Sequence, residues 1–282
     1  MADLWDHARV TDDLASNRAN WDERVPAHVA SPDYAVARFA ADPGYLSGVV
    51  AFDKARLGDL SGVRGVHLQC HIGTDTVSLC RLGAHMSGVD FSAPAIAAAR
   101  RLAEVTGADA DFVESDVHDA LEVLAPASFD LVYTGIGALC WLPSAQRWAR
   151  VVAGLLRPGG RLFLREGHPM LWALDDERGD DLVVRYPYFE HPDPVVYDST
   201  GTYVQTDVEF RATRVAVWNH GLGEVLGALV DHGLQITGLT EHDSVPWNSL
   251  PGQMERLDSG EWRLIEHPER LAHSYTLEAR KT

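Results

Sequence analysis

The feature that most constrains this chain is a regular alternation of short apolar segments and amphipathic helices that begins near residue 60. Parallel strands need long crossover connections, which are usually helices, so this order predicts an open, mostly parallel sheet with helices on both faces. Strands are expected at 66–70, 86–90, 110–113, 129–134, 161–166, 234–241 and 274–280. The helices between them are expected at 74–82, 92–106, 144–156 and 222–232.

Two segments interrupt this alternation. Residues 1–60 precede the first strand and have a helical pattern that includes Trp5, Trp21, Tyr34 and Phe39. Residues 169–218 follow the fifth strand and are rich in Pro, Tyr and Asp. We expect one domain over 1–282, divided into a helical cap (1–60), a core (61–168), an insertion that covers one end of the sheet (169–218) and the C-terminal part of the sheet (219–282).

Composition narrows the choice of partners. The formal net charge is −17, which argues against DNA or RNA, because phosphate binding needs a basic face. No long apolar run predicts a membrane span, and the first residues do not resemble a signal peptide. The cysteines, Cys70, Cys80 and Cys140, form no CxxC pair and predict free thiols in a reducing cytoplasm. These properties are compatible with a homodimer.

Four segments are expected at the carboxyl ends of the strands, where open parallel sheets bind ligands. The first is the loop Cys70-His71-Ile72-Gly73-Thr74-Asp75, in which Gly73 permits close approach of the backbone to a ligand. Asp90 ends the second strand and is placed to accept hydrogen bonds from two ribose hydroxyls. Asp116 follows the third strand and is placed to meet an adenine amino group. Thr134-Gly135-Ile136-Gly137 follows the fourth strand.

Together with Leu-Arg-Pro-Gly-Gly-Arg-Leu at 156–162, these segments resemble the class I S-adenosylmethionine-dependent methyltransferases between about residues 60 and 167. The resemblance implies a Rossmann-like, seven-stranded sheet whose last strand is antiparallel, and S-adenosylmethionine as cofactor. It assigns the methionine part to the loop that contains Cys70 and Gly73, the ribose to Asp90, and the adenine to Asp116 and Val117. The full cofactor-binding set is Trp21, Gln69, Cys70, Gly73, Asp90, Phe91, Ser92, Asp116, Val117 and Thr134.

The first loop departs from the family pattern, because it contains one glycine where GxGxG is usual. This version resembles a bacterial subgroup that acts on small metabolites. It counts against a nicotinamide dehydrogenase, which needs the second and third glycines. A Rossmann-like domain that binds another nucleotide is the structural alternative.

Three histidines are expected at the same edge of the sheet. His168 follows the fifth strand, and His220 begins a helix. His242 ends the sixth strand, which is expected to be an outer strand of the sheet. They would bind one divalent metal, zinc or similar. Alternatively, one would be a general base and the other two would have no catalytic role. Glu224 would be a metal ligand or its partner, or would complement the helix dipole.

The N-terminal cap adds two candidates. Trp21 would pack near the sulfonium through cation–π attraction. Arg24 would pair with a substrate carboxylate in bidentate fashion, or form a surface salt bridge. The predicted catalytic set is therefore Arg24, His168 and His220.

The reaction follows from these assignments. No Asn/Asp-Pro-Pro-aromatic motif of the nucleic-acid amino methyltransferases is present. The chain is similar to the bacterial 2-oxo acid C-methyltransferases of peptide-antibiotic biosynthesis, which implies methylation of a β-carbon through a metal-stabilised enolate. The alternatives are a metal-free O- or N-methyltransferase of a small metabolite with a histidine base, and a non-catalytic module that binds S-adenosylmethionine.

Overall fold

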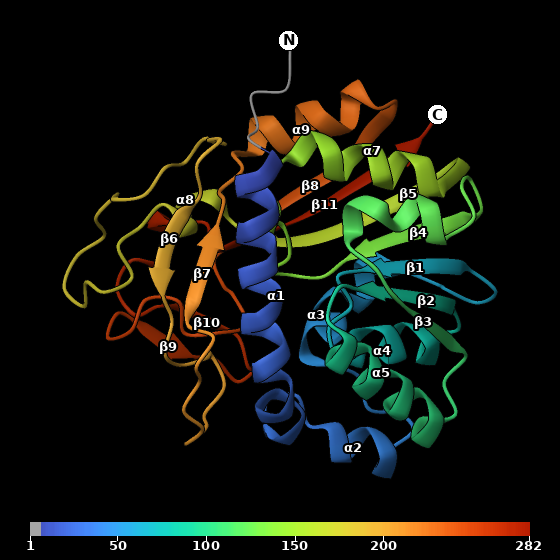
Figure 1. Ribbon diagram of the computed structural model, residues 1–282, viewed down its shortest axis with the longest axis horizontal. Coiled ribbons are helices and arrows are strands. Elements are labelled where there is room, and N and C mark those ends of the chain that lie inside the picture. The colour runs from blue at the N-terminus through green and yellow to red at the C-terminus, as the bar shows by residue number, and fades with distance from the viewer. Residues whose placement is uncertain (1–6) are drawn as a thin grey trace.

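The computed structural model describes residues 7–282 and is built around a seven-stranded sheet in the order β3-β2-β1-β4-β5-β11-β8 (Figure 1). Its strands are β1 (Arg64–Leu68), β2 (His85–Asp90), β3 (Ala110–Glu114), β4 (Phe129–Thr134), β5 (Leu156–Gly167), β8 (Leu234–His242) and β11 (Ser274–Lys281). β11 is antiparallel to both of its neighbours, β5 and β8, and the other pairs are parallel. The predicted Rossmann-like fold is confirmed, including its antiparallel last strand.

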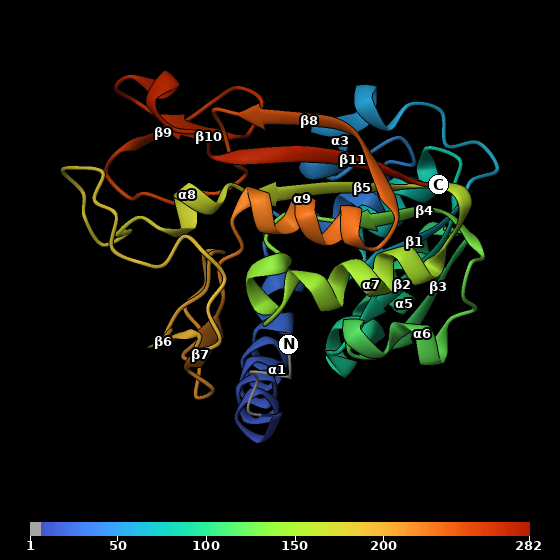
Figure 2. The ribbon, with the colours of Figure 1, turned by 90° about the horizontal axis from the view of Figure 1, so that it is seen from above.

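Helices cover both faces of the sheet, as Figures 1 and 2 show. One face packs against α3 (Gly48–Leu57), α4 (Thr74–Arg81) and α5 (Ala93–Thr106). The other face packs against α6 (Ala120–Val123), α7 (Ala145–Leu155) and α9 (Leu222–Asp231). Ser92 and Ser144 cap α5 and α7 through their hydroxyl oxygens, which is why those helices begin where the sequence predicts.

The remaining elements gather at the carboxyl end of the parallel strands (Figure 2). They are α1 (His7–Ala30), α8 (Pro169–Trp172), the hairpin β6 (Val195–Asp198)–β7 (Arg214–Val217), the hairpin β9 (Met254–Arg256)–β10 (Trp262–Leu264), and the 3-10 turns η1 (Val117–Asp119), η2 (Leu139–Trp141) and η3 (Pro268–Arg270). α2 (Val36–Ala41) lies instead against α4 and α5, where Phe39 packs with Val77 and Leu102. The sequence did not predict either hairpin, because strands of three or four residues are too short to show alternation. Trp5 lies outside the described residues.

One polar face of α1 binds the insertion. The side-chain amide of Asn17 donates to the carbonyl of Ala216 (2.8 Å) and its carbonyl accepts from the amide of Ala216 (2.9 Å). Asn20, three residues further along the helix, donates to the carbonyl of Ala212 (2.7 Å). These residues lie on one face because positions three and four apart are neighbours on a helix. α1 is therefore joined to the insertion, whereas α3, which also belongs to the predicted cap 1–60, packs on one face of the sheet.

No helix within residues 7–282 combines the length and the apolar character needed to cross a membrane.

Candidate active site

The loop after β1 turns sharply at three positions. Gln69 and His71 have φ values of 57° and 50°, and Gly73, the N-cap of α4, has 81°. A Cβ atom on Gly73 would lie 2.8 Å from the Cβ of Ala99 on α5. Glycine is therefore required there both by the left-handed backbone and by close helix packing. The Cys70 side chain is buried with Phe112 in the core, so only the backbone of Cys70 faces the loop.

Asp90 organises this loop from the end of β2. Its Oδ2 accepts a hydrogen bond from the amide of His71 (2.8 Å), and its Oδ1 accepts one from the amide of Ser92 (2.9 Å). Burial raises the pKa of Asp90 to about 6, although these amides oppose the shift. Each carboxylate oxygen keeps a second lone pair. Asp90 therefore retains acceptor capacity for the ribose hydroxyls predicted to bind there.

The other predicted cofactor residues follow the neighbouring strands. Asp116 begins η1 and its Oδ1 accepts from the amide of His118 (2.8 Å) and lies 3.0 Å from its Nδ1. Val117 is buried, and Phe91 lies under the guanidinium of Arg18, 5.6 Å from its ring centre. Asp116 is half-buried at the carboxyl edge of the sheet, and its contact with adenine stays a prediction.

Two buried polar atoms beside the loop support the fit of a bound cofactor. Oε1 of Gln69 and Oγ1 of Thr134 have no hydrogen-bond partner within residues 7–282. The amide nitrogen of Gln69 is already committed to the carbonyl of Ala138 (2.9 Å). Buried polar groups are normally hydrogen-bonded, so an unsatisfied pair at this edge is suited to the ammonium of a bound S-adenosylmethionine.

Glu166, at the end of β5, was not singled out from the sequence. Its carboxylate is buried and accepts hydrogen bonds from four backbone amides, those of Gly137, Ala138, Leu139 and Gly167, at 2.6–2.9 Å. Glu166 thereby holds the loop after β4. The sequence signal was an acidic residue at the carboxyl end of the strand, after the apolar run 162–164.

Aromatic rings from several segments pack against the first loop. We call Trp21, His28, Tyr34, His71, Trp141 and Tyr203 the aromatic cluster; they come from α1, the following turn, the first loop, η2 and the insertion. The ring centre of Trp21 lies 5.2 Å from that of His71 and 5.1 Å from that of Trp141. Trp21 thus lies against the first loop, and its packing near the sulfonium stays a prediction.

Two histidines of this cluster are in direct contact. Nδ1 of His28 lies 3.1 Å from Nε2 of His71, and Nε2 of His28 lies 2.7 Å from Oγ1 of Thr202. Burial, and then the charge of Arg24, lowers the pKa of His28 to about 4. Burial, followed by His28 and His67, lowers the pKa of His71 well below its ordinary value. Both imidazoles are therefore neutral at pH 7, because the ordinary pKa of histidine, about 6.5, is already below 7 and both shifts lower it further.

Arg24 has neither of the roles considered from the sequence. Its side chain is buried, and its five N–H donor directions reach backbone carbonyls of Asn20, Ser199, Gly201 and Ala212 at 2.7–3.1 Å. The guanidinium carbon lies 4.4 Å from the ring centre of Phe210. No donor is left for a substrate carboxylate, and the group is not a surface ion pair. Arg24 instead ties α1 to the insertion.

The three histidines predicted as metal ligands have separate partners. His168 accepts from the amide of Met170 at Nδ1 (3.1 Å) and contacts Glu241 at Nε2 (3.0 Å). His220 contacts Glu190 at Nδ1 (2.7 Å), and its Nε2 lies 3.1 Å and 2.8 Å from the carbonyl oxygens of Leu139 and Leu142. His242 contacts Thr276 at Nε2 (2.9 Å).

These contacts do not fit the predicted metal centre. A ligand histidine needs a free ring nitrogen, and both nitrogens of His168 and of His220 are committed within the protein. Within residues 7–282, no group of three or more His, Cys, Asp or Glu side chains is arranged to hold a metal ion. Glu224 follows its alternative role, because its Oε2 accepts from the amides of Gly221 (2.7 Å) and Glu190 (2.9 Å) at the start of α9.

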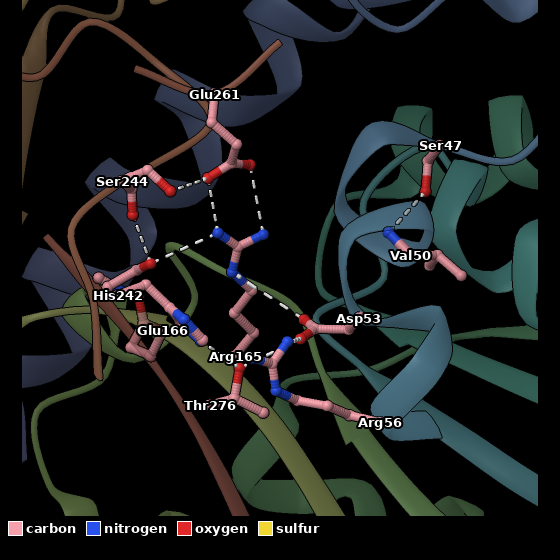
Figure 3. Close-up of polar contacts among 12 residues, drawn as sticks. Ser47, Val50, Asp53, Arg56, Arg165, Glu166, His242, Ser244, Glu261 and Thr276 are labelled. Atoms are coloured by element: carbon pink, nitrogen blue, oxygen red, sulfur yellow. Dashed lines mark hydrogen bonds and ion pairs between the residues drawn. The ribbon is translucent and has the colours of Figure 1, made fainter. Parts of the chain in front are cut away.

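His242 belongs instead to a buried charge network centred on Arg165 (Figure 3). Nη2 of Arg165 donates to Oε2 of Glu261 (2.7 Å), and its Nε lies 3.9 Å from Oδ2 of Asp53. Thr276, the partner of His242, donates to Oδ1 of Asp53 (3.2 Å). This network joins α3, β5, β11 and the segment before β10, so its role is structural.

Comparison with known proteins agrees with this architecture. Residues 66–162 match the family described as methyltransferase domain. This range contains the first loop, Asp90, Asp116 and Thr134. Residues 66–162 are thus similar to methyltransferase domains.

The chain is also similar, over part of its length, to curated proteins. Over 106 residues the chain is 34% identical to the ubiquinone biosynthesis O-methyltransferase of Xanthomonas euvesicatoria, which covers 38% of this chain and 44% of that protein. The protein of the same name from Ralstonia nicotianae is 33% identical over 109 residues, 39% of this chain and 45% of that protein. The matches thus span less than half of these relatives.

Solved structures extend the likeness of fold beyond residues 66–162. A structure from Listeria monocytogenes described as an S-adenosylmethionine-dependent methyltransferase has a TM-score of 0.58 at 17% identity, and covers 83% of this chain and 97% of its own. The 1,6-didemethyltoxoflavin-N1-methyltransferase of Burkholderia thailandensis has a TM-score of 0.54 at 16% identity, with 96% of this chain and 90% of its own covered. The chain therefore has the fold of the class I S-adenosylmethionine-dependent methyltransferases.

Proposed function

We propose that this protein transfers a methyl group from S-adenosylmethionine to a small molecule. The observation that carries this proposal is the first loop, where Asp90 orders the backbone and buried atoms of Gln69 and Thr134 remain without partners beside it. When bound, the cofactor would supply an electrophilic methyl group on a sulfonium. Asp90 would hold the ribose, Asp116 and Val117 the adenine, and Gln69 and Thr134 the methionine ammonium.

The acceptor in this proposal is small. α1 and the insertion are hydrogen-bonded to each other over the carboxyl edge of the sheet, and the aromatic cluster lies beneath them. A net charge of −17 is unfavourable for a nucleic-acid acceptor. A small acceptor held in such a site would be positioned against the methyl carbon, and positioning is the main contribution of an enzyme to methyl transfer.

Transfer to oxygen or nitrogen is favoured over C-methylation of a 2-oxo acid. The metal-enolate route requires ligand histidines, and His168 and His220 have no free ring nitrogen. The carboxylate clamp expected at Arg24 is occupied by backbone carbonyls. The curated relatives that match the domain are named as O-methyltransferases, which supports transfer to oxygen.

Two measurements test this function. Calorimetry should show binding of S-adenosylmethionine and S-adenosylhomocysteine to the purified chain. Formation of S-adenosylhomocysteine should then be followed with panels of phenols, amines and 2-oxo acids, with and without a strong chelator. Absence of cofactor binding and of turnover would reject the proposal, and turnover of 2-oxo acids that chelator abolishes would restore the C-methylation route.

A further inference from the structure

The described histidines near the cofactor loop differ in how their ring nitrogens are used. Both nitrogens of His28 have partners, His71 and Thr202, as do both nitrogens of His168 and His220. For His71 the structure records a partner at Nε2 alone, and Nδ1 is not among the buried unsatisfied atoms of residues 7–282. His71 is half-buried and lies directly in the cofactor loop. Among residues 7–282, Nδ1 of His71 therefore has no recorded partner, and it is not fully enclosed.

We propose that His71 is the catalytic proton acceptor of this enzyme, that His28 and Thr202 form a relay behind it, and that the acceptor substrate reacts through a hydroxyl group, as in a phenol or an enol. This inference rests on the proposed methyl-transfer function. It names the group that takes the proton and the class of nucleophile. The sequence placed His71 in the loop but assigned the base to other histidines.

The hydrogen bonds define one arrangement of protons that makes His71 a base. If Nε2 of His71 donates to Nδ1 of His28, then Nε2 of His28 donates to the hydroxyl of Thr202. A neutral imidazole carries one N–H, so Nδ1 of His71 then holds a free lone pair. Thr202 belongs to the insertion and is half-exposed, so the relay ends where solvent has access.

The reaction balances through this relay. The hydroxyl oxygen forms a bond to the methyl carbon, and the carbon–sulfur bond breaks with its electron pair passing to sulfur, which gives S-adenosylhomocysteine. The hydroxyl proton passes to Nδ1 of His71. The Nε2 proton of His71 then moves to His28, and the Nε2 proton of His28 moves to Thr202, whose own proton is released to solvent. The positive charge of the sulfonium thereby leaves the site as a proton.

The buried environment of His28 and His71 favours a hydroxyl oxygen over an alkyl amine as nucleophile. Buried, neutral imidazoles beside each other are weak bases. A hydroxyl oxygen that gains a methyl group becomes strongly acidic, so even a weak base removes its proton as the bond forms. A methylated alkyl ammonium is a much weaker acid and would keep its proton in the presence of such a base.

The decisive variant is His71→Asn. Asparagine tolerates the left-handed backbone found at this position (φ 50°), but its amide cannot take up a proton at neutral pH. His242→Gln is the matched control, because His242 is another neutral histidine, with its pKa lowered by burial to about 4, and it lies in the Arg165 network. Each protein is assayed with 4-methoxyphenol and with 4-nitrophenol. The assay is run at pH 8.5, where the first is still mostly protonated, like other phenols of pKa about 10, and the second, made far more acidic by its nitro group, is almost fully ionised.

Turnover of 4-methoxyphenol by His71→Asn should fall by roughly 10²–10⁴-fold, the usual contribution of a general base. Turnover of 4-nitrophenol should hardly change relative to the wild-type protein, because no proton has to be accepted. Affinity for S-adenosylhomocysteine should be retained, and His242→Gln should resemble the wild-type protein with both phenols. Equal losses with the two phenols would make His71 a structural residue and would overturn the inference.

The two proposals fail in different ways. A wild-type protein that methylates amines or 2-oxo acids but no hydroxyl compound overturns the inference and leaves the methyltransferase function intact. A protein that neither binds the cofactor nor methylates any compound overturns the function itself.

A measurement on the complex with S-adenosylhomocysteine is independent of the substrate. Nitrogen-15 NMR of labelled histidines should find the His71 proton on Nε2 and Nδ1 unprotonated at pH 7. A proton on Nδ1 of His71 would overturn the inference whether or not a phenol is turned over.

Discussion

Two buried carboxylates order the loops at the carboxyl edge of the sheet. Asp90 accepts hydrogen bonds from the amides of His71 and Ser92, and Glu166 accepts from four amides after β4 and β5. Hydrogen bonds from amides to a charged acceptor are stronger than those between neutral groups. At the residue scale, single acidic side chains therefore set the shape of the candidate site.

For Asp90, we predict that Asp90→Ala weakens binding of S-adenosylmethionine by about 1–3 kcal/mol, because the ribose hydroxyls lose a charged acceptor. Calorimetry at neutral pH measures this change directly. Circular dichroism provides the folding control. Unchanged affinity in a folded variant would remove Asp90 from the cofactor site.

For Glu166, we predict that Glu166→Gln lowers the free energy of unfolding. A carboxamide offers one acceptor oxygen, so two of the four amides would face an N–H group, at a cost of about 1–3 kcal/mol for each unsatisfied donor. Urea denaturation measures the loss. Glu241→Gln is the control, because Glu241 is half-exposed beside His168 and such pairs contribute about 0–1 kcal/mol. Equal stabilities of the two variants would contradict the assigned role of Glu166.

At the scale of elements, buried polar contacts connect segments that are far apart in sequence. Asn17 on α1 pairs with the backbone of β7, 199 residues away, and Arg165 on β5 pairs with Glu261, 96 residues away. The ring of Phe52 on α3 lies 3.6 Å from the guanidinium carbon of Arg165. These contacts attach α1 to the insertion, and they attach α3 and the β9–β10 hairpin to the sheet.

For the Arg165 network, we predict that Arg165→Leu destabilises the protein by about 3–5 kcal/mol, because it leaves the carboxylates of Asp53 and Glu261 buried without their cation. Hydrogen exchange should also accelerate in β9 and β10. Arg263→Leu removes a half-exposed ion pair with Glu255 and should cost less than about 1 kcal/mol. A small effect of Arg165→Leu would show that the network does not stabilise the fold.

At the scale of the whole molecule, buried ionisable groups of opposite kinds make stability depend on pH. Burial lowers the pKa of His28 to about 4 and that of His67 to about 3, and it raises the pKa of Asp90 to about 6. Below pH 6.5 these histidines bind protons in the unfolded state but not in the folded state. Their titration therefore lowers the free energy of unfolding as pH falls. Asp90 acts in the opposite direction, because its folded form binds a proton first.

We predict that the difference in free energy of unfolding between the wild-type protein and His28→Gln changes with pH between 6.5 and about 4, by up to about 1.4 kcal/mol per pH unit. The wild-type protein should lose stability relative to His28→Gln as pH falls. Asp90→Ala should show the opposite trend, because the wild-type protein gains stability from proton binding at Asp90 below about pH 6. Urea denaturation over this pH range, without cofactor, measures both. Parallel pH profiles for all three proteins would contradict the burial of these groups.

The sequence by itself was sufficient for the sheet and for the edge at which the site lies. β4 is observed at its predicted bounds, and β8 and β11 differ from theirs by one residue. This succeeded because apolar periodicity and helix caps are local signals, and because parallel crossovers bring all carboxyl ends to one edge. Asp90, Asp116 and Thr134 were placed there by strand order alone.

The tertiary structure decided which side chains meet. Topology brings His168, His220 and His242 to the same edge, but both ring nitrogens of His168 and His220, and Nε2 of His242, are committed by partners 2 to 81 residues away, such as Met170, Glu190 or Leu139. The same packing brings His28 to His71, across 43 residues, and uses every donor of Arg24 on carbonyls of α1 and the insertion. Topology determines the edge at which a residue lies, whereas the direction of its side chain and the partners that occupy its polar atoms depend on the packing of the whole chain.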